Sequence, residues 1–248
     1  MLAIQFKQYK YLVHSTIIAV LIMILSCQKN DDNYVLIKSP SAFSAVELHS
    51  SFDVLLTEDS VYSINFTGKE DIVKGIEYSV TDSVLKIEDP RRSEWRTPKS
   101  NKITLHITSP DVKLLTTFEA CNITSSSTLH YDELGLILGG KANDVSLDLK
   151  CKEFYYWGGS VTGGKITLSG STEQLKLWNT GLIQVDAAQC QTNYCFIENK
   201  SRGNCEVTVS DKLDYSIFNI GDIIMHGTPP IINKLEGDSN ATGKLIQN

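Results

Sequence analysis

Four aromatic side chains recur about once per twenty residues in the second half of the chain, at positions suited to binding a ligand. They share one phase of the pattern with Leu136 and Leu138, and they are Tyr156, Trp178, Phe196 and Phe218. Flat rings in a row cover the apolar faces of sugars and also anchor protein partners. The row is therefore a candidate binding face for a glycan or a surface protein. The alternative is that another segment, such as the N-terminal strands, packs over it.

The acidic and histidine side chains do not predict a catalytic centre. Asp144, Glu206 and Asp222 approach one another in the repeat, but no basic partner clearly joins them. Hydrolysis of a glycosidic bond would need a carboxylate pair at a defined separation. The histidines after residue 26 lie far apart in sequence and none has a nucleophile motif beside it: His49, His106, His130 and His226. We expect no catalytic residue, no metal site and no cofactor, and therefore no enzyme.

The cysteines after Cys27 are predicted to line the core. They are Cys121, Cys151, Cys190, Cys195 and Cys205. An odd number cannot all pair, so at most one disulfide is expected. The spacing of the last three fits no zinc pattern. A free cysteine at an inward position behaves as a small apolar residue.

The elements that must hold these side chains repeat with a period of twenty residues. Ile137, Trp157, Leu177, Ile197 and Ile217 fall one period apart. A second track of small, apolar, polar and apolar residues runs alongside, as in Gly164–Leu168. A period of this length with several short strands is typical of a solenoid whose repeats stack side by side. We predict an all-β protein with a right-handed parallel β-helix, or β-solenoid, over residues 114–248.

Alternation of side chains assigns the two faces of each wall. In the first wall, Leu177 and Ile197 are predicted to point inward, which places the aromatic row outward. The second wall has a regular pattern in which the inward residues are Ile166, Leu168, Ile183, Val185, Cys205, Val207, Ile223 and Met225. Its outward residues are Lys165, Thr167, Gln184, Glu206 and Thr208. The second wall is thus apolar inside and polar outside.

Three asparagines share the inward phase two positions after the apolar track: Asn179, Asn199 and Asn219. We expect a stacked amide ladder at a corner of the coil, each amide donating to the next about 4.8 Å away. The alternative is three turn asparagines that share a phase by chance, because Asn favours turns.

Residues 41–113 form an N-terminal β region with the alternation of half-buried strands. The expected strands cover residues 43–48, 52–56, 62–66, 76–80, 84–87 and 102–107. Residues 70–75 could form one helical turn. Residues 41–248 are expected to make one continuous domain.

Residues 1–26 have the features of a lipoprotein signal peptide. Lys7 and Lys10 precede an apolar stretch that is too short to span a membrane and ends in Leu25-Ser26-Cys27. This ending resembles the bacterial lipobox and predicts lipid attachment at Cys27, with residues 27–40 as a tether. The acidic sequence after Lys29 resembles the surface-export signal of Bacteroidetes lipoproteins. The predicted location is the outer membrane, lipid-anchored at the cell surface, or otherwise facing the periplasm.

Net charge argues against nucleic acid as a partner. The whole chain carries −6, and the leader holds two lysines and no acid, so the rest carries 21 basic and 29 acidic residues, or −8. Phosphate binding requires a basic surface. A local exception is the loop at residues 90–102, in which basic residues surround Trp95. It could contact anionic lipid or polysaccharide, although a solvated hairpin tip is the more common outcome.

The order of these features resembles a known bacterial family. Phe52-Asp-Val-Leu-Leu56, the strand ending at Ile107 before Ser109-Pro110, the repeated Gly-x-Ile units and the ending Gly227-Thr-Pro-Pro230 are similar to the "head GIN domain" family of putative auto-transporter adhesins. The resemblance covers residues 41–246 and implies a β-solenoid without catalytic residues. The usual Gly-Ser-Gly units are altered here, for example at Asn179-Thr-Gly181.

Together these features predict a cell-envelope lipoprotein with a non-catalytic binding or adhesion role at the bacterial surface. A structural or signalling envelope protein in the periplasm is the second reading, and a carbohydrate-active β-helix enzyme is the third.

Overall fold

The computed structural model describes residues 33–91, 102–159 and 162–248, and residues 33–248 form one compact unit. About 62% of the described residues are strand and 2% are helix, which confirms the predicted all-β solenoid, with about six turns and a curled mixed sheet at its N-terminal side. The elements of the first part are β1 (Tyr34–Lys38), β2 (Ala45–Leu48), β3 (Asp53–Glu58), β4 (Ser63–Gly68), α2 (Glu70–Val73), β5 (Glu77–Thr81), β6 (Val84–Glu88) and β7 (Thr104–Ser109). The coil continues with β8 (Leu114–Thr117), β9 (Asn122–Ser125), β10 (Glu133–Leu138), β11 (Asn143–Gly158), β12 (Gly163–Asn179), β13 (Leu182–Asn199), β14 (Cys205–Ile217), β15 (Ile223–His226), β16 (Ile231–Lys234) and β17 (Leu245–Gln247).

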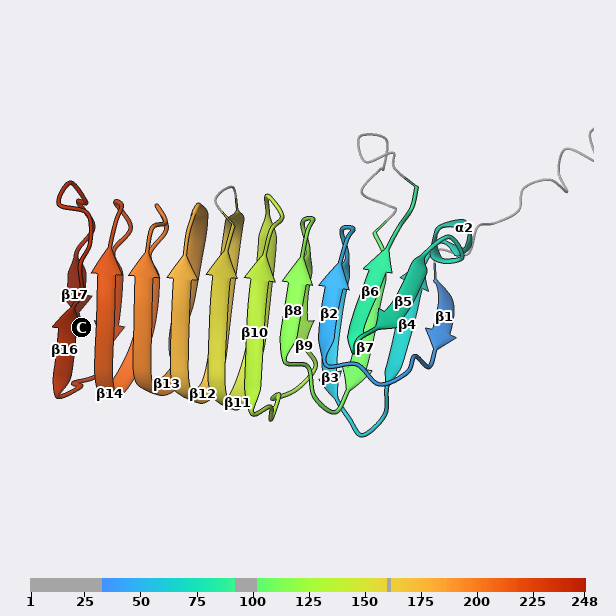
Figure 1. The fold of residues 1–248 in the computed structure, drawn as a ribbon, viewed down its shortest axis with the longest axis horizontal. Helices are drawn as coiled ribbons and strands as arrows, with labels where there is room; N and C mark the ends of the chain where they lie inside the picture. Colours follow the sequence, from blue (N-terminus) through green and yellow to red (C-terminus); the bar gives the residue numbers. More distant parts are fainter. Residues whose placement is uncertain (1–32, 92–101, 160–161) are drawn as a thin grey trace, which may run out of the picture. The chain divides into compact units, whose positions relative to one another are not determined.

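The strands build two facing walls, and they stand side by side from β1 at one end to β16 and β17 at the other (Figure 1). The first wall runs β6–β2–β8–β10 and continues through the C-terminal halves of β11 to β14 to β16, with all pairs parallel. The second wall runs β7–β3–β9 and continues through the N-terminal halves of β11 to β14 to β15 and β17. Each long strand from β11 to β14 therefore bends from the second wall into the first.

The second wall has the predicted alternation. All eight residues assigned inward are buried, and the five assigned outward are exposed or half-buried. Inward side chains from both walls meet in one apolar core. Burial of this surface is the main favourable term for the fold, at about 25 cal/mol per Å² of apolar area.

The predicted phase of the first wall is wrong in β10 and β11. Leu136, Leu138 and Tyr156 are buried, whereas Trp157 is 59% exposed. The reason is that the repeat is not constant at twenty residues. Trp157 pairs with Trp178, 21 residues away. With a strict period of twenty, the first-wall side chains of β10 and β11, which precede this step, are therefore all assigned to the wrong face.

The asparagine ladder is confirmed for two of its three members. Asn179 and Asn199 are buried, and Asn179 Nδ2 donates to Asn199 Oδ1 at 3.2 Å. Asn219 does not join them, because Asn199 pairs with Ile217, only 18 residues on. Asn219 Nδ2 donates instead to the Lys200 carbonyl. The coil shortens at β14 and moves the third amide out of register.

The N-terminal strands enter the same two walls in a different order from the sequence. β2 pairs with both β6 and β8, and β3 pairs with both β7 and β9. The coil of β2 and β3 therefore lies between the coil of β6 and β7 and that of β8 and β9. Antiparallel pairs β5–β6, β4–β7 and β1–β4 complete the end. Helix α2 confirms the predicted helical turn and contacts β1 and β4.

The five cysteines within the described residues are free and buried, which confirms a cysteine-lined core. Burial raises the pKa of Cys121 and Cys190 to about 11, and that of Cys151 and Cys205 to about 12. Burial also raises the pKa of Cys195. Because the thiolate is the reactive form, these thiols are protected from oxidation and alkylation in the folded chain.

Within the described part of the chain, no helix has the length and apolar character needed to cross a membrane.

Candidate functional site

The outer side of the first wall carries a cluster of aromatic side chains from three neighbouring strands. We call it the aromatic face and define it as Tyr155 and Trp157 of β11, Trp178 of β12, and Tyr194 and Phe196 of β13. All five are followed by a buried residue and point away from the core. Trp178 and Phe196 pack together with ring centroids 5.3 Å apart and planes tilted by 46°. Trp157 lies beside Trp178 in the register.

A glycine makes room for one of these rings. Gly135 of β10 pairs with Tyr155 of β11, and a Cβ at Gly135 would lie 2.1 Å from Tyr155 Cζ. The Tyr155 ring therefore lies flat over the backbone of β10 and extends the aromatic face across a third strand gap. Burial raises the pKa of the Tyr155 phenol, and nearby Glu133 contributes.

Polar groups surround the rings at hydrogen-bonding distance from one another. Lys176 lies between Tyr155 of β11 and Phe196 of β13 in the strand register, and its Nζ contacts Glu153 Oε1 at 2.8 Å. Beside Tyr194, Asp214 accepts from the Tyr194 hydroxyl at 2.9 Å and from Asn233 Nδ2 at 2.8 Å, and it pairs with Lys212. Sugar hydroxyls require such donors and acceptors next to apolar rings.

The network around Asp214 fixes its charge. Burial opposes ionisation of Asp214, but hydrogen bonds from Lys212, Asn233 and Tyr194 outweigh burial and lower its pKa. Burial together with the hydrogen bond to Asp214 raises the pKa of Tyr194 to about 12. At neutral pH the edge of the aromatic face therefore carries the ionised carboxylate of Asp214, fixed by its hydrogen bonds, and the neutral phenol of Tyr194.

The four predicted site residues have different positions in the structure. Trp178 and Phe196 are outward and in contact, as predicted. Tyr156 is 0% exposed and points into the core, so it cannot contribute to an outer face. Phe218 follows β14 and packs instead under Lys200, whose Nζ is 4.9 Å from the ring centroid. It lies away from the Trp178–Phe196 pair, at the corner of the coil.

Tyr155, Trp157 and Tyr194 were missed by the reading of the sequence. Tyr155-Tyr156-Trp157 is a run of three aromatics, so it fits either phase of a strand. Gly135 was an available signal, because a glycine inside a strand often marks a close approach by another group.

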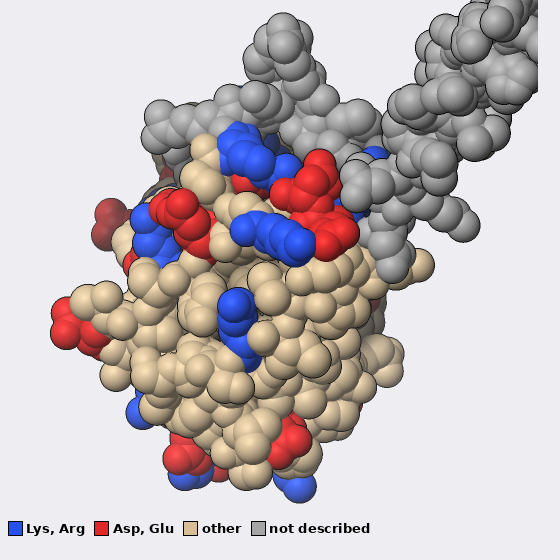
Figure 2. Space-filling view, turned by 90° about the vertical axis from the view of Figure 1, so that its right-hand side faces the viewer, with Lys and Arg blue, Asp and Glu red and all other residues tan. Residues whose placement is uncertain are grey.

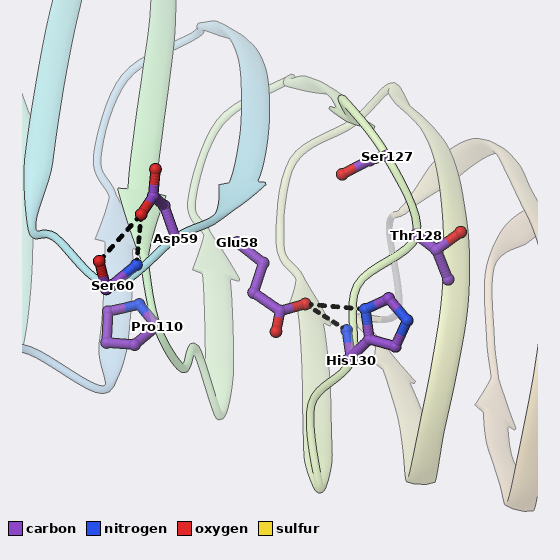
Figure 3. Close-up of a pocket in the computed structure, with 7 residues that line it drawn as sticks. All are labelled: Glu58, Asp59, Ser60, Pro110, Ser127, Thr128 and His130. Carbon is purple, nitrogen blue, oxygen red and sulfur yellow. Dashed lines mark hydrogen bonds and ion pairs between the residues drawn. The ribbon is translucent and has the colours of Figure 1, made fainter.

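A shallow polar cleft of about 490 Å³ lies elsewhere, at the ends of β3, β7 and β9 (Figure 3). Glu58 Oε2 accepts from the backbone N–H of His130 at 2.5 Å and lies 3.2 Å from its Nδ1, while Asp59 Oδ1 accepts from Ser60. Each acidic group of the cleft is thus occupied by a neighbour. Among the described residues of the cleft, no hydroxyl is hydrogen-bonded to the His130 imidazole, as a nucleophile paired with a general base would be.

Other candidate chemistry is dispersed. The histidines contact four separate groups: Glu47, Thr57, Glu58 and Glu206. No cluster of three His, Cys, Asp or Glu side chains that could hold a metal ion occurs within residues 33–91, 102–159 and 162–248. The lipidation residue Cys27 and the basic loop around Trp95 lie outside the described residues.

Comparisons with known proteins identify relatives by family and fold. The family model described as "Putative auto-transporter adhesin, head GIN domain" matches residues 42–229. No curated protein matches the chain significantly. The chain is similar to the crystal structure of a putative adhesin from Bacteroides fragilis, with a TM-score of 0.77, 16% identity, and coverage of 87% of this chain and 96% of the other.

Two further structures from Parabacteroides share the fold. One, from Parabacteroides distasonis, is described as a putative lipid binding protein, with a TM-score of 0.62, 17% identity and coverage of 88% and 98%. The other is a putative adhesin from Parabacteroides merdae, with a TM-score of 0.58, 16% identity and coverage of 88% and 97%. At these identities the likeness concerns the fold alone.

Proposed function

The chain belongs to the head GIN domain family of putative auto-transporter adhesins, and from this premise we propose that it is a non-catalytic binding protein of the bacterial cell envelope. Its aromatic face binds ligand, and a glycan is the ligand class that the face supports best. A surface protein is the second candidate, because large rings with a polar rim also serve protein interfaces.

The observation that carries this proposal is the exposure of rings that the fold does not need. Trp157 is 59% exposed, although its neighbours in the strand already fill the core. A solvated strand position is normally polar, and the outward positions of the second wall in the same coils follow that rule except at Leu182, which is 62% exposed at the start of β13. An apolar patch with a polar rim on a soluble surface indicates an interaction site.

The geometry favours a sugar over an apolar small molecule. The rings lie on an open wall and not in an enclosed pocket, and the ion pair Lys176–Glu153 stands among them. A flat chain of sugar rings can stack on the aromatics while its hydroxyls reach the charged groups at the rim. Aromatic contacts of this kind contribute about 0.5–1.5 kcal/mol each beyond area burial.

We further propose that Cys27 is lipidated and holds the protein at the outer membrane, with the solenoid on the cell surface. Support comes from Ser26-Cys27 after a short apolar stretch and from the acidic tether. Protease treatment of intact cells, with lysed cells as control, tests this location. Digestion only after lysis would favour the periplasmic reading and remove the surface role.

The binding proposal is tested with residues 28–248 on an array of bacterial and host glycans. Trp157→Ala and Phe196→Ala should each weaken binding roughly 2- to 10-fold, the factor that corresponds to the loss of one aromatic contact. Gln184→Ala, on the outer side of the second wall, is the matched control and should bind as wild type does. Equal binding by all four proteins would contradict a role for the aromatic face. Binding to a surface protein in place of glycans, with the same variant pattern, would identify the second candidate.

A further inference from the structure

We propose that the N-terminal end of the solenoid docks directly on the lipid surface, with Val35 and Ile37 of β1 in the interfacial layer of the bilayer. This rests on the proposed anchor at Cys27 and concerns a surface other than the aromatic face. In this proposal the lipid on Cys27 attaches the protein to the membrane, and the contact of β1 with the bilayer orients the solenoid.

The first observation is an apolar edge at this end of the stack. β1 is the outermost strand of the second wall, where it pairs with β4. Its alternate side chains Val35 and Ile37 are 51% and 64% exposed, while Leu36 between them packs against the core. In β5, the outermost strand of the first wall at the same end, Tyr78 is also exposed. Exposed Val, Ile and Tyr side chains together suit the membrane interface, where aromatic rings with a polar tip are enriched.

The second observation is the distribution of charge at this end. Figure 2 looks onto it and shows a broad uncharged area around a single Lys or Arg side chain, with the other basic groups and the acidic groups in view mostly toward its upper part and rim. The outer sides of both walls carry ion pairs such as Lys165–Asp186 and Lys176–Glu153, whereas the pair nearest to Val35 and Ile37 is Lys74–Glu70 on α2, beside β1 and not on it. Laying either wall on a membrane would remove charged groups from water, whereas the N-terminal end can approach lipid at lower cost.

The third observation is the length of chain between the anchor and β1. Six residues separate Cys27 from Tyr34, the first residue of β1. A fully extended chain of this length reaches about 25 Å at most. The strands from β1 to β17 in the second wall, stacked about 4.8 Å apart, span roughly 50 Å. A lipid at Cys27 therefore keeps the N-terminal end close to the membrane and leaves the C-terminal end out of reach.

The test uses the full chain, isolated with its lipid and reconstituted in phosphatidylethanolamine–phosphatidylglycerol vesicles that contain nitroxide-labelled phospholipid. Ile37→Cys and, at the far end, Ile246→Cys are each labelled with an environment-sensitive fluorophore. The five buried thiols are protected from the label, and wild type serves as the labelling control. Both substituted side chains are exposed, so neither change disturbs the core.

We expect several-fold stronger nitroxide quenching and a blue-shifted emission at position 37 compared with position 246. Val35→Asp beside the label should reduce the quenching at position 37, whereas Ile231→Asp at the far end, at a side chain of similar exposure, should not. Circular dichroism checks that all variants keep the fold.

The outcomes separate this inference from the proposed anchor. Mass spectrometry that finds no lipid on Cys27 of the membrane-isolated protein overturns both the anchor and the docking. Lipid on Cys27 with equally weak quenching at positions 37 and 246 overturns the docking alone. Strong quenching that Val35→Asp leaves unchanged also overturns it, because the contact would not depend on the apolar edge.

Discussion

The outer sides of the two walls differ, although the same coils build both. On the second wall the outward positions of β12 to β14 are mostly polar, as at Lys165, Thr167, Gln184 and Glu206, and Leu182 at the start of β13 is the single exposed large apolar residue among them. On the first wall the equivalent positions hold the aromatic face. The inner sides are alike in being apolar, since both are filled mainly by aliphatic residues and cysteines, with Phe154 and Tyr156 in addition on the first wall. Core packing therefore cannot explain the aromatics, and the difference indicates that the two walls meet different surroundings.

The largest expected effect is on stability, and it compares a buried with an exposed aromatic residue of the same strand, β11. Phe154 is fully buried, so Phe154→Ala should lower the free energy of unfolding by about 3–5 kcal/mol. Trp157→Ala, three residues away and exposed, should change it by less than about 1 kcal/mol. Urea unfolding followed by circular dichroism measures both. A loss at Trp157 as large as that at Phe154 would make the aromatic face part of the fold and erase the contrast between the walls.

An intermediate effect is expected at the corner that joins the walls. Asn199 accepts from Asn179 and from the backbone N–H of Ser201, and it donates to the Gly221 carbonyl. Asn199→Leu removes these bonds, although Asn179 Nδ2 keeps its bond to the Ile183 carbonyl, and should lower the free energy of unfolding by about 1–3 kcal/mol, the cost of a buried polar group left unsatisfied. Asn219→Leu, at the amide outside the ladder, should stay within about 0.5 kcal/mol. Similar losses in thermal melts of the two variants would mean that the buried pair has no special role.

A smaller effect compares two lysines with the same kind of partner on opposite walls. Lys176 pairs with Glu153 at 2.8 Å on the first wall, and Lys165 pairs with Asp186 at 2.9 Å on the second. Surface pairs contribute about 0–1 kcal/mol, so either Lys→Ala change should hardly affect stability. On the glycan array, only Lys176→Ala should weaken binding. Equal loss at both lysines would point to a general charge effect and not to a site on one wall.

The smallest expected effect is the acid dependence of the network beside Tyr194. The pKa of Asp214 is lowered in the folded chain, so its ionisation stabilises the fold above the unfolded pKa of about 3.9. That contribution is lost as the pH falls through the lowered folded pKa. Asp214→Asn should be less stable than wild type at pH 7, by up to about 1 kcal/mol, and the difference should shrink near pH 3. Urea unfolding at the two pH values measures it, and a constant difference would refute the assignment.

The sequence predicts the inward and outward faces of the second wall completely from β12 to β15, and those of the first wall only in part. Short units such as Gly164–Leu168 fix their own phase, because a glycine begins each one and two apolar residues alternate with polar ones. Gly164 also has φ of +120°, and a Cβ there would lie 1.9 Å from the Asn143 carbonyl oxygen. The first wall lacks such a marker. A step of 21 residues at Trp157 and one of 18 at Asn199 change the phase, and only the hydrogen-bonded register reveals them.

The placement of the N-terminal strands was also beyond the sequence. Alternation identifies β2 to β7 as strands, but it does not specify their neighbours. β2 and β8 are separated by more than sixty residues and yet pair directly. Such pairing depends on which exposed edges are complementary in three dimensions, and periodicity within one segment carries no information on that.

The intercalated coil of β2 and β3 has a mechanical consequence. A force that enters through the N-terminal tether reaches β1 first, at Tyr34, and β1 pairs antiparallel with β4, so its hydrogen bonds open one after another. Release of residues 34–44 would lengthen the chain by about 35 Å at roughly 3.3 Å per residue. The load then meets β2, which is bonded to a strand on each side. If the protein is anchored and binds ligand as proposed, a cell tethered through it in flowing liquid would stretch a yielding first strand, while the coils that carry the aromatic face keep their shape under tension.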